Sequence, residues 1–390
     1  MNILFVLKTL EIGGVEVVSS VLANKFVSEG LRVSVFAFSK GEKRNIESFD
    51  SSVNLYLGNG FSVSKDNVAK FREIIINEKV DVVINQWGLP LVPIKVINEA
   101  RKGLLTKVIS VFHNDPLQNG RLQGVKTEIE KTNNIFKILL LRFKWLAFRC
   151  VTGFAMGYIY RHSDKFEVLS PSFVDHFKQF TCIFNPEKLV VQTNPITINN
   201  GGFVYDVNKK LKEIIYVGRV DYTQKRVQRV IDTWAQLENK FPDWRLTIVG
   251  DGEERENMER MVKDQELQNV SFEGFQLPKP YYERASILIL TSEFEGFPLV
   301  LAECMSFGVV PVVYGSYSAV YDIIEDGKDG IIVPKGNDGF NADVMAERIK
   351  PLMANHDKLN YMALNAIEKS KNYSIDKIYE QWMGVIHSII

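Results

Sequence analysis

Two successive series of short apolar segments, each alternating with segments of helical periodicity, constrain most strongly how this 390-residue chain can fold. In the first half, the ranges that predict strands are 2–7, 31–38, 53–57, 81–85 and 107–112. The ranges that predict helices between some of these strands are 15–27, 65–78 and 93–101. Strands that alternate with helices pair in parallel through right-handed crossovers. The first half therefore predicts a doubly wound α/β domain.

The second half of the chain repeats this pattern. Its predicted strands are 214–217, 245–249, 270–272, 287–290, 310–313 and 331–333, and its predicted helices are 227–239, 253–263, 299–306 and 342–353. Residues 193–202, between the halves, are rich in Gly and Asn, as linkers are. We predict two doubly wound domains, residues 1–195 and 196–373, that face each other across a cleft.

Charge and cysteine usage narrow the class of protein. The chain has 47 basic and 47 acidic residues, which gives no indication of a nucleic-acid partner. Cys150, Cys182 and Cys304 fit neither a metal site nor a disulfide framework, and they favour a reducing compartment. The first residues lack the basic region and cleavage site of a signal peptide, so we expect a cytoplasmic protein.

Two carboxylates, Glu295 and Glu303, lie on either side of a predicted helix start. Pro298 is near the first helical position, where proline is favoured, and the free N–H groups of a first helical turn form an anion site. A nucleotide-sugar offers a diphosphate for such a site and hydroxyls that carboxylates can hold. Glutamates at this spacing are also common on surface helices, so the pair argues for this ligand only together with other signals.

Further signals follow two other predicted strands of the second half. Gly218 ends a strand, and Arg219 and Lys225 come directly after it, where two cations suit a diphosphate. An ordinary surface loop is the alternative. Gly250 and Gly252 form a turn after the next strand that lacks the third glycine of a dinucleotide fingerprint, so we interpret it as a turn beside the nucleotide base.

The first half offers fewer candidates. Gly13 and Gly14 lie between the first strand and a helix, where they let a phosphate or sugar approach the backbone or else form a structural tight turn. His113 is the one histidine of five that follows a predicted strand directly, and we expect its side chain to enter the cleft.

Together these motifs resemble those of the retaining glycosyltransferases of family 4, which have the GT-B fold of two Rossmann-like domains. The resemblance covers nearly the whole chain, and the motifs fall in the order of the family. It rests on Gly13–Glu16, His113, Gly218 with Arg219 and Lys225, residues 249–252, and residues 295–298 with Glu303. The tail resembles the last helix of the family, so residues 374–390 are expected to pack back on the N-terminal domain, with Ser374 as cap.

The resemblance implies a role for each of these residues. Arg219 and Lys225 would bind the donor diphosphate and stabilise the charge that develops on it. Glu303 would hold the nucleotide ribose and Glu295 the donor sugar, while His113 would contact the sugar or the transition state. The implied catalytic residues are Arg219, Lys225, Glu295 and His113, and the implied donor-binding residues are Gly13, Gly14, Gly218, Gly250, Gly252, Gly296, Phe297, Pro298, Leu299 and Glu303.

The resemblance also implies substrates and cofactors. The donor would be a nucleoside-diphosphate sugar, most often of UDP, and the acceptor a glycan or a lipid-linked glycan of a bacterial surface polysaccharide. No essential metal is implied, and the chain contains no Asp-x-Asp pair. Two positions depart from the family: Arg226 replaces a usual glycine, and residues 314–322 replace a Gly-Gly-x-x-Glu turn. Two other functions stay open, a nucleotide-sugar epimerase of the same fold and a non-catalytic nucleotide-sugar-binding subunit.

Residues 131–163 form a basic amphipathic segment without an acidic residue. Its apolar residues on one predicted helical face are Phe136, Leu139, Leu140, Phe143, Leu146 and Ala147, and its cations off that face are Lys131, Lys137, Arg142, Lys144 and Arg149. Such a helix can lie on an anionic bilayer, which would place the protein at the inner face of the cell membrane. The alternative is a domain helix that buries its apolar face under solvated cations.

Overall fold

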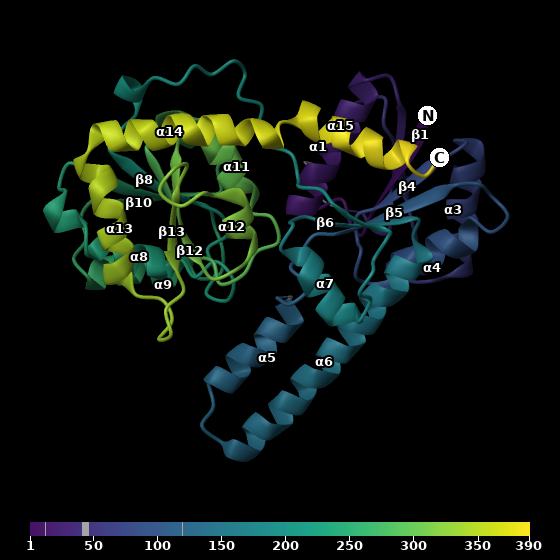
Figure 1. Ribbon diagram of the computed structural model, residues 1–390, viewed down its shortest axis with the longest axis horizontal. Coiled ribbons are helices and arrows are strands. Elements are labelled where there is room, and N and C mark those ends of the chain that lie inside the picture. Colours follow the sequence, from purple (N-terminus) through teal and green to yellow (C-terminus); the bar gives the residue numbers. More distant parts are fainter. Residues whose placement is uncertain (12, 41–46, 119) are drawn as a thin grey trace. The chain divides into compact units, whose positions relative to one another are not determined.

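The computed structural model describes residues 1–11, 13–40, 47–118 and 120–390, which form two compact units. Unit 1 comprises Met1–Thr197 and Ser374–Ile390, and unit 2 comprises Ile198–Tyr373. Each unit contains one parallel sheet with helices around it (Figure 1). The prediction of doubly wound α/β architecture in both halves is confirmed.

Unit 1 contains a seven-stranded sheet in the order β3-β2-β1-β4-β5-β6-β7. Its strands are β1 (Asn2–Leu7), β2 (Arg32–Ala37), β3 (Asn54–Leu57), β4 (Val82–Asn85), β5 (Lys107–Phe112), β6 (Lys165–Val168) and β7 (Leu189–Val191). Its helices are α1 (Gly14–Ser28), α3 (Lys65–Asn77), α4 (Leu91–Ala100), α5 (Gly120–Glu130), α6 (Ile135–His162), α7 (Phe173–Thr181) and α15 (Ile375–His387). The sequence predicted the first five strands and missed the last two, because buried Glu167 interrupts the apolar run of β6 and β7 has only 3 residues.

Unit 2 contains a six-stranded sheet in the order β10-β9-β8-β11-β12-β13. Its strands are β8 (Glu213–Val217), β9 (Arg245–Val249), β10 (Val270–Gly274), β11 (Ile287–Leu290), β12 (Val310–Gly315) and β13 (Ile331–Pro334). Its helices are α8 (Gln228–Ala235), α9 (Arg255–Asp264), α10 (Lys279–Arg284), α11 (Leu299–Ser306), α12 (Ala319–Ile323), α13 (Ala342–Ala354) and α14 (His356–Ser370), with short 3₁₀ turns at Val207–Lys209, Glu238–Lys240 and Lys371–Tyr373. All six strands of this unit had been predicted.

The strand order of each sheet reverses next to its first strand. In unit 1, β1 pairs with both β2 and β4, and in unit 2, β8 pairs with both β9 and β11. The connections that follow the two neighbouring strands at this point therefore run toward opposite ends of the sheet. Ligands of open α/β sheets bind outside the carboxyl ends of the strands at such a reversal, so the loops after β1, β4, β8 and β11 are where a site is expected.

Helix α15 belongs to unit 1 although it is the last element of the chain. Ser374 accepts a hydrogen bond from the Lys377 N–H at 3.4 Å, which makes it the N-cap that the sequence predicts. The buried ring of Trp382 packs edge-on against Phe26 of α1, with 6.4 Å between ring centroids. Asp376 forms an ion pair with Lys25 at 2.6 Å. The apolar stripe of α15 thus completes the core of unit 1.

Helices α5 and α6 form a hairpin that projects from the sheet of unit 1 (Figure 1). Asn134 caps α6 by accepting a hydrogen bond from the Lys137 N–H at 3.1 Å. The far part of α6 exposes its large apolar side chains, Phe136 among them at 86%. The alternative in which the domain buries this apolar face is therefore wrong. Within the described residues, no helix combines the length and apolar composition that crossing a membrane requires.

Candidate functional site

A largely buried ion pair joins the loops that follow β8 and β11. The Lys225 Nζ lies 2.6 Å from Glu295 Oε1, and the two side chains are only 16% and 8% exposed. The Gln224 side-chain amide donates to the other Glu295 oxygen at 3.2 Å and to the Phe294 carbonyl at 3.2 Å. Two donors therefore fix the Glu295 carboxylate at the strand reversal of unit 2.

Arg219 adds an exposed cation to the same loop. Its Nε donates to Asp221 Oδ2 at 2.9 Å and its Nη2 to Gln224 Oε1 at 3.2 Å, while 64% of the side chain remains exposed. The other Asp221 oxygen accepts from the backbone N–H groups of Gln224 and Lys225 at 2.6 and 3.1 Å. Burial by itself raises the pKa of Asp221, but the hydrogen bonds from Gln224 and Arg219 outweigh it and lower the pKa. A charged Asp221 thus orders the loop that carries both cations.

The glycines of this edge allow two backbone segments to touch. Gly218 and Gly250 have φ angles of 151° and 146°, which few other residues adopt. A Cβ on Gly250 would lie 1.8 Å from the Gly218 carbonyl oxygen, and one on Gly252 would lie 2.3 Å from that of Val220. The turn after β9 therefore packs directly against the backbone of the loop that carries Arg219 and Lys225. This contact explains the need for glycine at positions 250 and 252 without a ligand.

Arg226, at the position where the family resemblance implies a glycine, adopts a backbone conformation typical of glycine. Arg226 has a φ of 55°, the left-handed conformation that glycine favours. Its guanidinium lies over the Tyr222 ring, 4.8 Å from the ring centroid. The Thr291 hydroxyl donates to the Arg226 carbonyl at 3.1 Å. These contacts hold a non-glycine residue in a conformation that ordinarily costs it free energy.

Helix α11 starts at the same edge, after the loop that carries Glu295. Pro298 is its N-cap, and Leu299, the first helical residue, matches the predicted start. The ring of Phe297 is buried against Tyr373, with 5.4 Å between ring centroids. Gly296 lies between Glu295 and this ring. The first turn of α11 therefore lies at the strand reversal of unit 2, where its free backbone N–H groups favour the binding of an anion.

Glu303 lies inside α11 and is buried. Its Oε2 accepts a hydrogen bond from the Tyr282 hydroxyl at 3.4 Å. Burial, together with the charge of Glu303, raises the pKa of Tyr282, so the phenol stays protonated and remains a donor. Glu295 and Glu303 thus occupy separate places on either side of the helix start.

The loop after β12 replaces the turn that the family resemblance implies. The Ser316 hydroxyl donates to the Ser292 carbonyl at 2.5 Å and so ties this loop to the one after β11. The Tyr317 side chain is 2% exposed, and burial, with nearby Glu295, raises the pKa of its phenol. Tyr317 was not predicted, because a tyrosine in a loop carries no signal of its own in a single sequence.

In unit 1, the turn after β1 contains the predicted glycines. Gly13 is the N-cap of α1, and Gly14 is the first residue of the helix. A Cβ on Gly13 would lie 2.5 Å from Glu16 Oε2. Glu16 is buried, and this burial raises the pKa of its carboxyl. A carboxyl group therefore sits beside the start of α1, which sequence analysis did not single out as a site.

His113 follows β5 and is held by a residue of the neighbouring strand end. Its Nε2 lies 2.6 Å from Oε1 of Gln86, a buried side chain directly after β4. Burial lowers the pKa of His113 to about 4, so the imidazole is neutral near pH 7. Gln86 was not predicted, although its place directly after a predicted strand could have indicated it.

A second histidine supports the loop after β5. Nδ1 of His176, on α7, lies 2.8 Å from Oδ1 of Asp115, whose side chain is fully buried. The same Asp115 oxygen accepts a hydrogen bond from the Leu117 N–H at 2.8 Å. The sequence analysis had passed over both residues, although Asp115 lies two positions from His113. The pair fixes the path of the chain just beyond His113.

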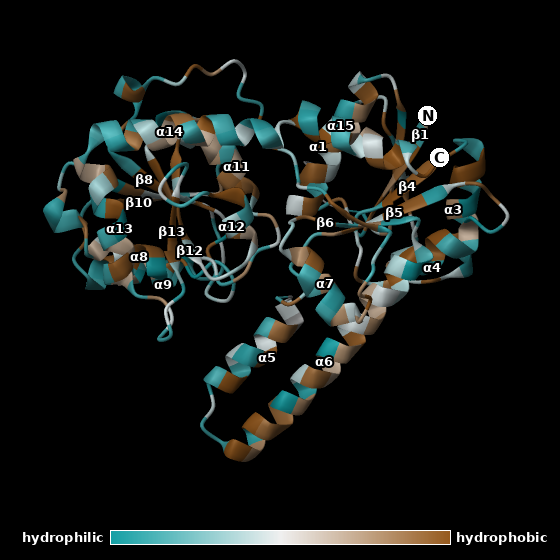
Figure 2. Cartoon of the chain, in the orientation of Figure 1, coloured by the Kyte–Doolittle hydropathy of each residue, from teal (hydrophilic) through white to brown (hydrophobic). Residues whose placement is uncertain are grey.

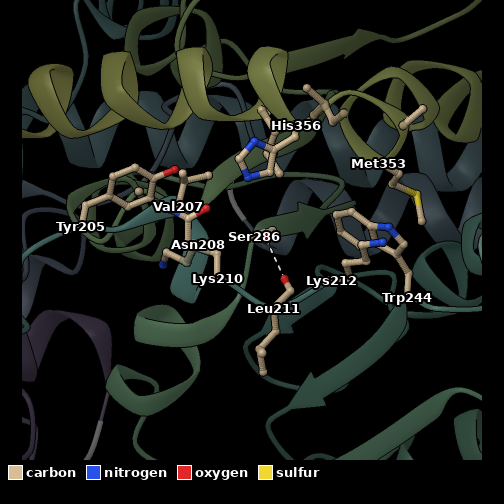
Figure 3. A pocket seen from close by; sticks show the side chains of 14 residues that line it. Tyr205, Val207, Asn208, Lys210, Leu211, Lys212, Trp244, Ser286, Met353 and His356 are labelled. Carbon is tan, nitrogen blue, oxygen red and sulfur yellow. Dashed lines mark hydrogen bonds between the residues drawn. The ribbon is translucent and has the colours of Figure 1, made fainter.

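Unit 2 also contains a cavity of about 340 Å³ at the opposite edge of its sheet (Figure 3). Leu211 and Ser286, which line it, come just before β8 and β11, and the Ser286 hydroxyl donates to the Leu211 carbonyl at 2.6 Å. Lys210 donates to the Tyr282 carbonyl at 2.7 Å, and burial lowers the pKa of this lysine to about 7. Since the cavity lies at the amino ends of the strands, it is distinct from the Lys225–Glu295 edge.

The structure brings three of the predicted residues together in unit 2. Arg219, Lys225 and Glu295 share one hydrogen-bonded network in unit 2, in which Gln224 links Arg219 to Glu295 and Glu295 in turn accepts from Lys225. In unit 1, His113 directly follows β5 and Gly14 begins the helix after β1, and β4 separates these two strands in the sheet. Among the residues that the structure describes, no three or more His, Cys, Asp or Glu side chains gather as a metal site would need.

Comparison with known proteins identifies the family. Residues 12–200 match Glycosyltransferase Family 4, and residues 199–369 match Glycosyl transferases group 1. An uncharacterized glycosyltransferase of Haemophilus influenzae is 25% identical over 98% of this chain and 98% of its own length. The GalNAc-alpha-(1->4)-GalNAc-alpha-(1->3)-diNAcBac-PP-undecaprenol alpha-1,4-N-acetyl-D-galactosaminyltransferase of Campylobacter jejuni is 24% identical over 100% of this chain and 99% of its own.

Solved structures show the same fold. The lipopolysaccharide outer core galactosyltransferase WaaB aligns over 100% of both chains with a TM-score of 0.69 and 19% identity. HepE of Anabaena, solved in complex with UDP, aligns over 100% of both chains with a TM-score of 0.75 and 18% identity. The boundary between the two family matches, at residues 199–200, is close to the sequence boundary between the two units, at residues 197–198. The chain has the GT-B fold and belongs to the group 1 glycosyltransferases of family 4.

Proposed function

We propose that this glycosyltransferase moves a sugar from a nucleoside-diphosphate sugar to a glycan or lipid-linked glycan, with retention of anomeric configuration, in the synthesis of a bacterial surface polysaccharide. The observation that carries the proposal is the largely buried Lys225–Glu295 pair at the strand reversal of unit 2, with Arg219 exposed in the same loop. A carboxylate and two cations at one point suit a ligand that carries both hydroxyls and phosphates.

The two cations would act on the diphosphate that leaves when the bond to the sugar breaks. Arg219 would form a bidentate contact with phosphate oxygens, because its guanidinium is exposed and already oriented by Asp221. Lys225 would supply a point charge. Since both cations are fixed before the reaction, they stabilise the charge that develops without a cost of reorganisation. With the start of α11 they provide the positive field of the site, and we propose that no metal ion is essential.

The carboxylates would orient the two ends of the donor. Glu295 would accept hydrogen bonds from hydroxyls of the donor sugar, and the backbone N–H groups of Phe297 and Leu299 would donate to the same sugar. Glu303 would accept them from the ribose of the nucleotide. UDP is the nucleotide we propose, in view of the UDP complex of HepE. From unit 1, Gly14 would approach the diphosphate and neutral His113 the sugar.

The acceptor would bring the enzyme to the cytoplasmic face of a membrane. The Campylobacter relative is named after a glycan linked to PP-undecaprenol, which supports a lipid-linked acceptor here. Residues 131–163 are the segment that we assign to membrane contact, because they carry the exposed apolar side chains of α6 and no acidic residue.

A panel of nucleotide-sugars, each incubated with the pure protein, tests the proposed activity. Slow release of the nucleoside diphosphate and free sugar, with the anomer of the fresh product assigned by NMR, is the result we expect. Conversion of the donor into its epimer would instead indicate an epimerase. Tight binding of a donor without any turnover, even with added glycan acceptors, would indicate a non-catalytic subunit.

A further inference from the structure

The part of α6 farthest from the sheet of unit 1 carries eight large apolar side chains that are each at least half exposed. These residues, named here the α6 apolar face, are Ile135, Phe136, Leu139, Leu140, Phe143, Leu146, Val151 and Phe154, with exposed fractions from 52% to 86%. Figure 2 shows the hydrophobic colour along this part of the helix. Soluble proteins rarely expose so many neighbouring apolar side chains, and larger exposed patches mark interaction sites.

The α6 apolar face is separate from the face that packs in the unit. At about 100° per residue, its eight members fall within an arc of about 160°. Residues on the other side of the helix, such as Leu141, Thr152 and Met156, are buried. The helix is therefore apolar on two sides, one inside the unit and one outside, and the fold of unit 1 explains only the first.

Cations border the α6 apolar face along both edges. At the same angular spacing, Lys137 and Lys144 lie beyond one edge and Arg142 and Arg149 beyond the other. Residues 131–163 contain no acid, and the nearest acidic partner on α5 is Glu128, 3.5 Å from Lys144. Arg149 instead lies over the rings of Trp145 and Phe180. The surface is thus an apolar strip between two rows of positive charge.

We propose that the α6 apolar face docks on an anionic lipid bilayer, with its apolar side chains among the acyl chains and its cations at the lipid phosphates. The proposal rests on the proposed function, since it assigns the surface that brings a lipid-linked acceptor to the enzyme. A helix with this pattern lies in the plane of the interface and gains free energy from both apolar burial and attraction to anionic lipids. The cations along both edges of the strip keep the helix from spanning the bilayer.

A bilayer fits this surface better than a second copy of the chain. In a symmetric dimer the same patch meets itself, so the two cation rows would face like charges. Anionic headgroups complement the rows instead. From residue 135 to residue 154 the helix extends for about 30 Å, which gives a long, narrow footprint suited to an interface.

A groove at one end of the strip connects it to the candidate site of unit 1. The groove has a volume of about 660 Å³, and the residues lining it include Leu89, Leu91, Asn114, Val151 and Ala155. Val151 belongs to the α6 apolar face, and Asn114 follows His113 at the end of β5. A lipid held at α6 would therefore have an apolar path toward the strand ends where the acceptor is expected.

Co-sedimentation with vesicles tests the docking surface directly. The full-length protein is mixed at low salt with vesicles of phosphatidylcholine alone or with 30% phosphatidylglycerol. We expect sedimentation with the anionic vesicles only and release as salt rises, because counter-ions screen the cations. F136S with F143S, or K137E with R142E, should lower the bound fraction at fixed lipid by about tenfold or more. L277S, at a residue 77% exposed in unit 2, is the matched control and should bind like wild type.

Two results would overturn the proposal. One is wild type that stays in solution with anionic vesicles at low salt. The other is a concentration-dependent dimer, measured by light scattering, that F136S with F143S abolishes while lipid binding persists, since the face would then pair with itself. Donor hydrolysis should be unchanged in both double variants, so loss of vesicle binding and failure of the proposed sugar transfer are observed separately.

Discussion

The carboxyl edges of the two sheets have the same topology but opposite chemistry. In unit 2 the loops at the strand reversal are joined by the charged groups of Lys225, Glu295 and Arg219, which are held in place before any ligand arrives. In unit 1 the equivalent edge offers the neutral imidazole of His113 and the amide of Gln86, and the nearby groove is mainly apolar. Topology therefore sets where a ligand binds, while loop residues decide which ligand it is. The charged edge suits a diphosphate, and the neutral edge suits hydroxyls and lipid.

The largest expected effect on activity comes from removing one of the two cations of the charged edge in unit 2. We expect K225A and R219A each to lower turnover of the donor at least about a hundredfold, the usual scale when a group that stabilises developing charge is lost. K225A should be the more severe, because it leaves the buried Glu295 carboxylate without its ion-pair partner. Single-turnover kinetics measures the effect.

K328A provides the control for the cation variants. Lys328 forms an exposed ion pair with Glu325 at 2.8 Å and precedes β13, at the other edge of the sheet. The K328A variant should retain the activity of wild type. If R219A and K225A also stay within about threefold of wild type, the diphosphate assignment fails.

The two glutamates should separate binding of the nucleotide from use of the sugar. E303A is expected to weaken binding of the free nucleoside diphosphate by about 1–3 kcal/mol, through the loss of hydroxyl hydrogen bonds. E295A should leave that binding nearly intact and impair turnover of the sugar donor. Isothermal titration calorimetry with UDP, beside donor kinetics, distinguishes them. The reverse pattern would mean that the two ends of the donor site are exchanged.

The neutral edge can be tested through the pH dependence of stability. Burial lowers the pKa of His113 to about 4, below its ordinary value of 6.5, so the unfolded chain binds more protons between these values. Stability should therefore be full above pH 6.5 and fall as the pH drops toward 4. Relative to H113Q, wild type should lose about 1–2 kcal/mol of unfolding free energy between pH 7 and pH 5. Urea denaturation at both pH values measures it, and a stability difference between wild type and H113Q that stays constant or widens would contradict a neutral imidazole in the folded protein.

A chelator should have the smallest effect. Because Arg219, Lys225 and the start of α11 supply the positive field, excess EDTA is expected to leave donor turnover within about twofold of the untreated enzyme. Full loss of activity that magnesium or manganese restores would show that the charged edge is incomplete without a metal.

Most of the fold was predictable because it follows from short-range patterns. Five of the six strands of unit 2 are mainly apolar runs, the exception being β10 with Ser271 and Glu273, and α11 begins where the sequence Gly-Phe-Pro predicts. Strand β6 was missed because buried Glu167 interrupts its apolar pattern, and only the structure shows that it pairs with β5 on one side and β7 on the other. Patterns within a short window cannot indicate pairing across the sheet.

The candidate site was predictable where charge and glycine signals coincide. Arg219, Lys225 and Glu295 were named from the sequence, but the residues that orient them, Asp221 and Gln224, were not. A side chain that acts by hydrogen bonding to another loop has no local signature. The exposure of the apolar side of α6 was equally invisible, because an apolar stripe has the same spacing whether a domain covers it or not.

The placement of α15 has a consequence for how the protein is made. Unit 1 is discontinuous, and its core lacks Trp382 until residues 374–390 have been synthesised. Translation proceeds at about 5–20 residues per second, so unit 2 occupies the ribosome for about 9–35 s before that helix appears. During this interval Phe26 of α1 lacks the cover of Tyr379 and Trp382, and a chaperone has time to bind this apolar surface. Unit 2, whose sequence is continuous, can finish folding first, although it is the second unit to be translated.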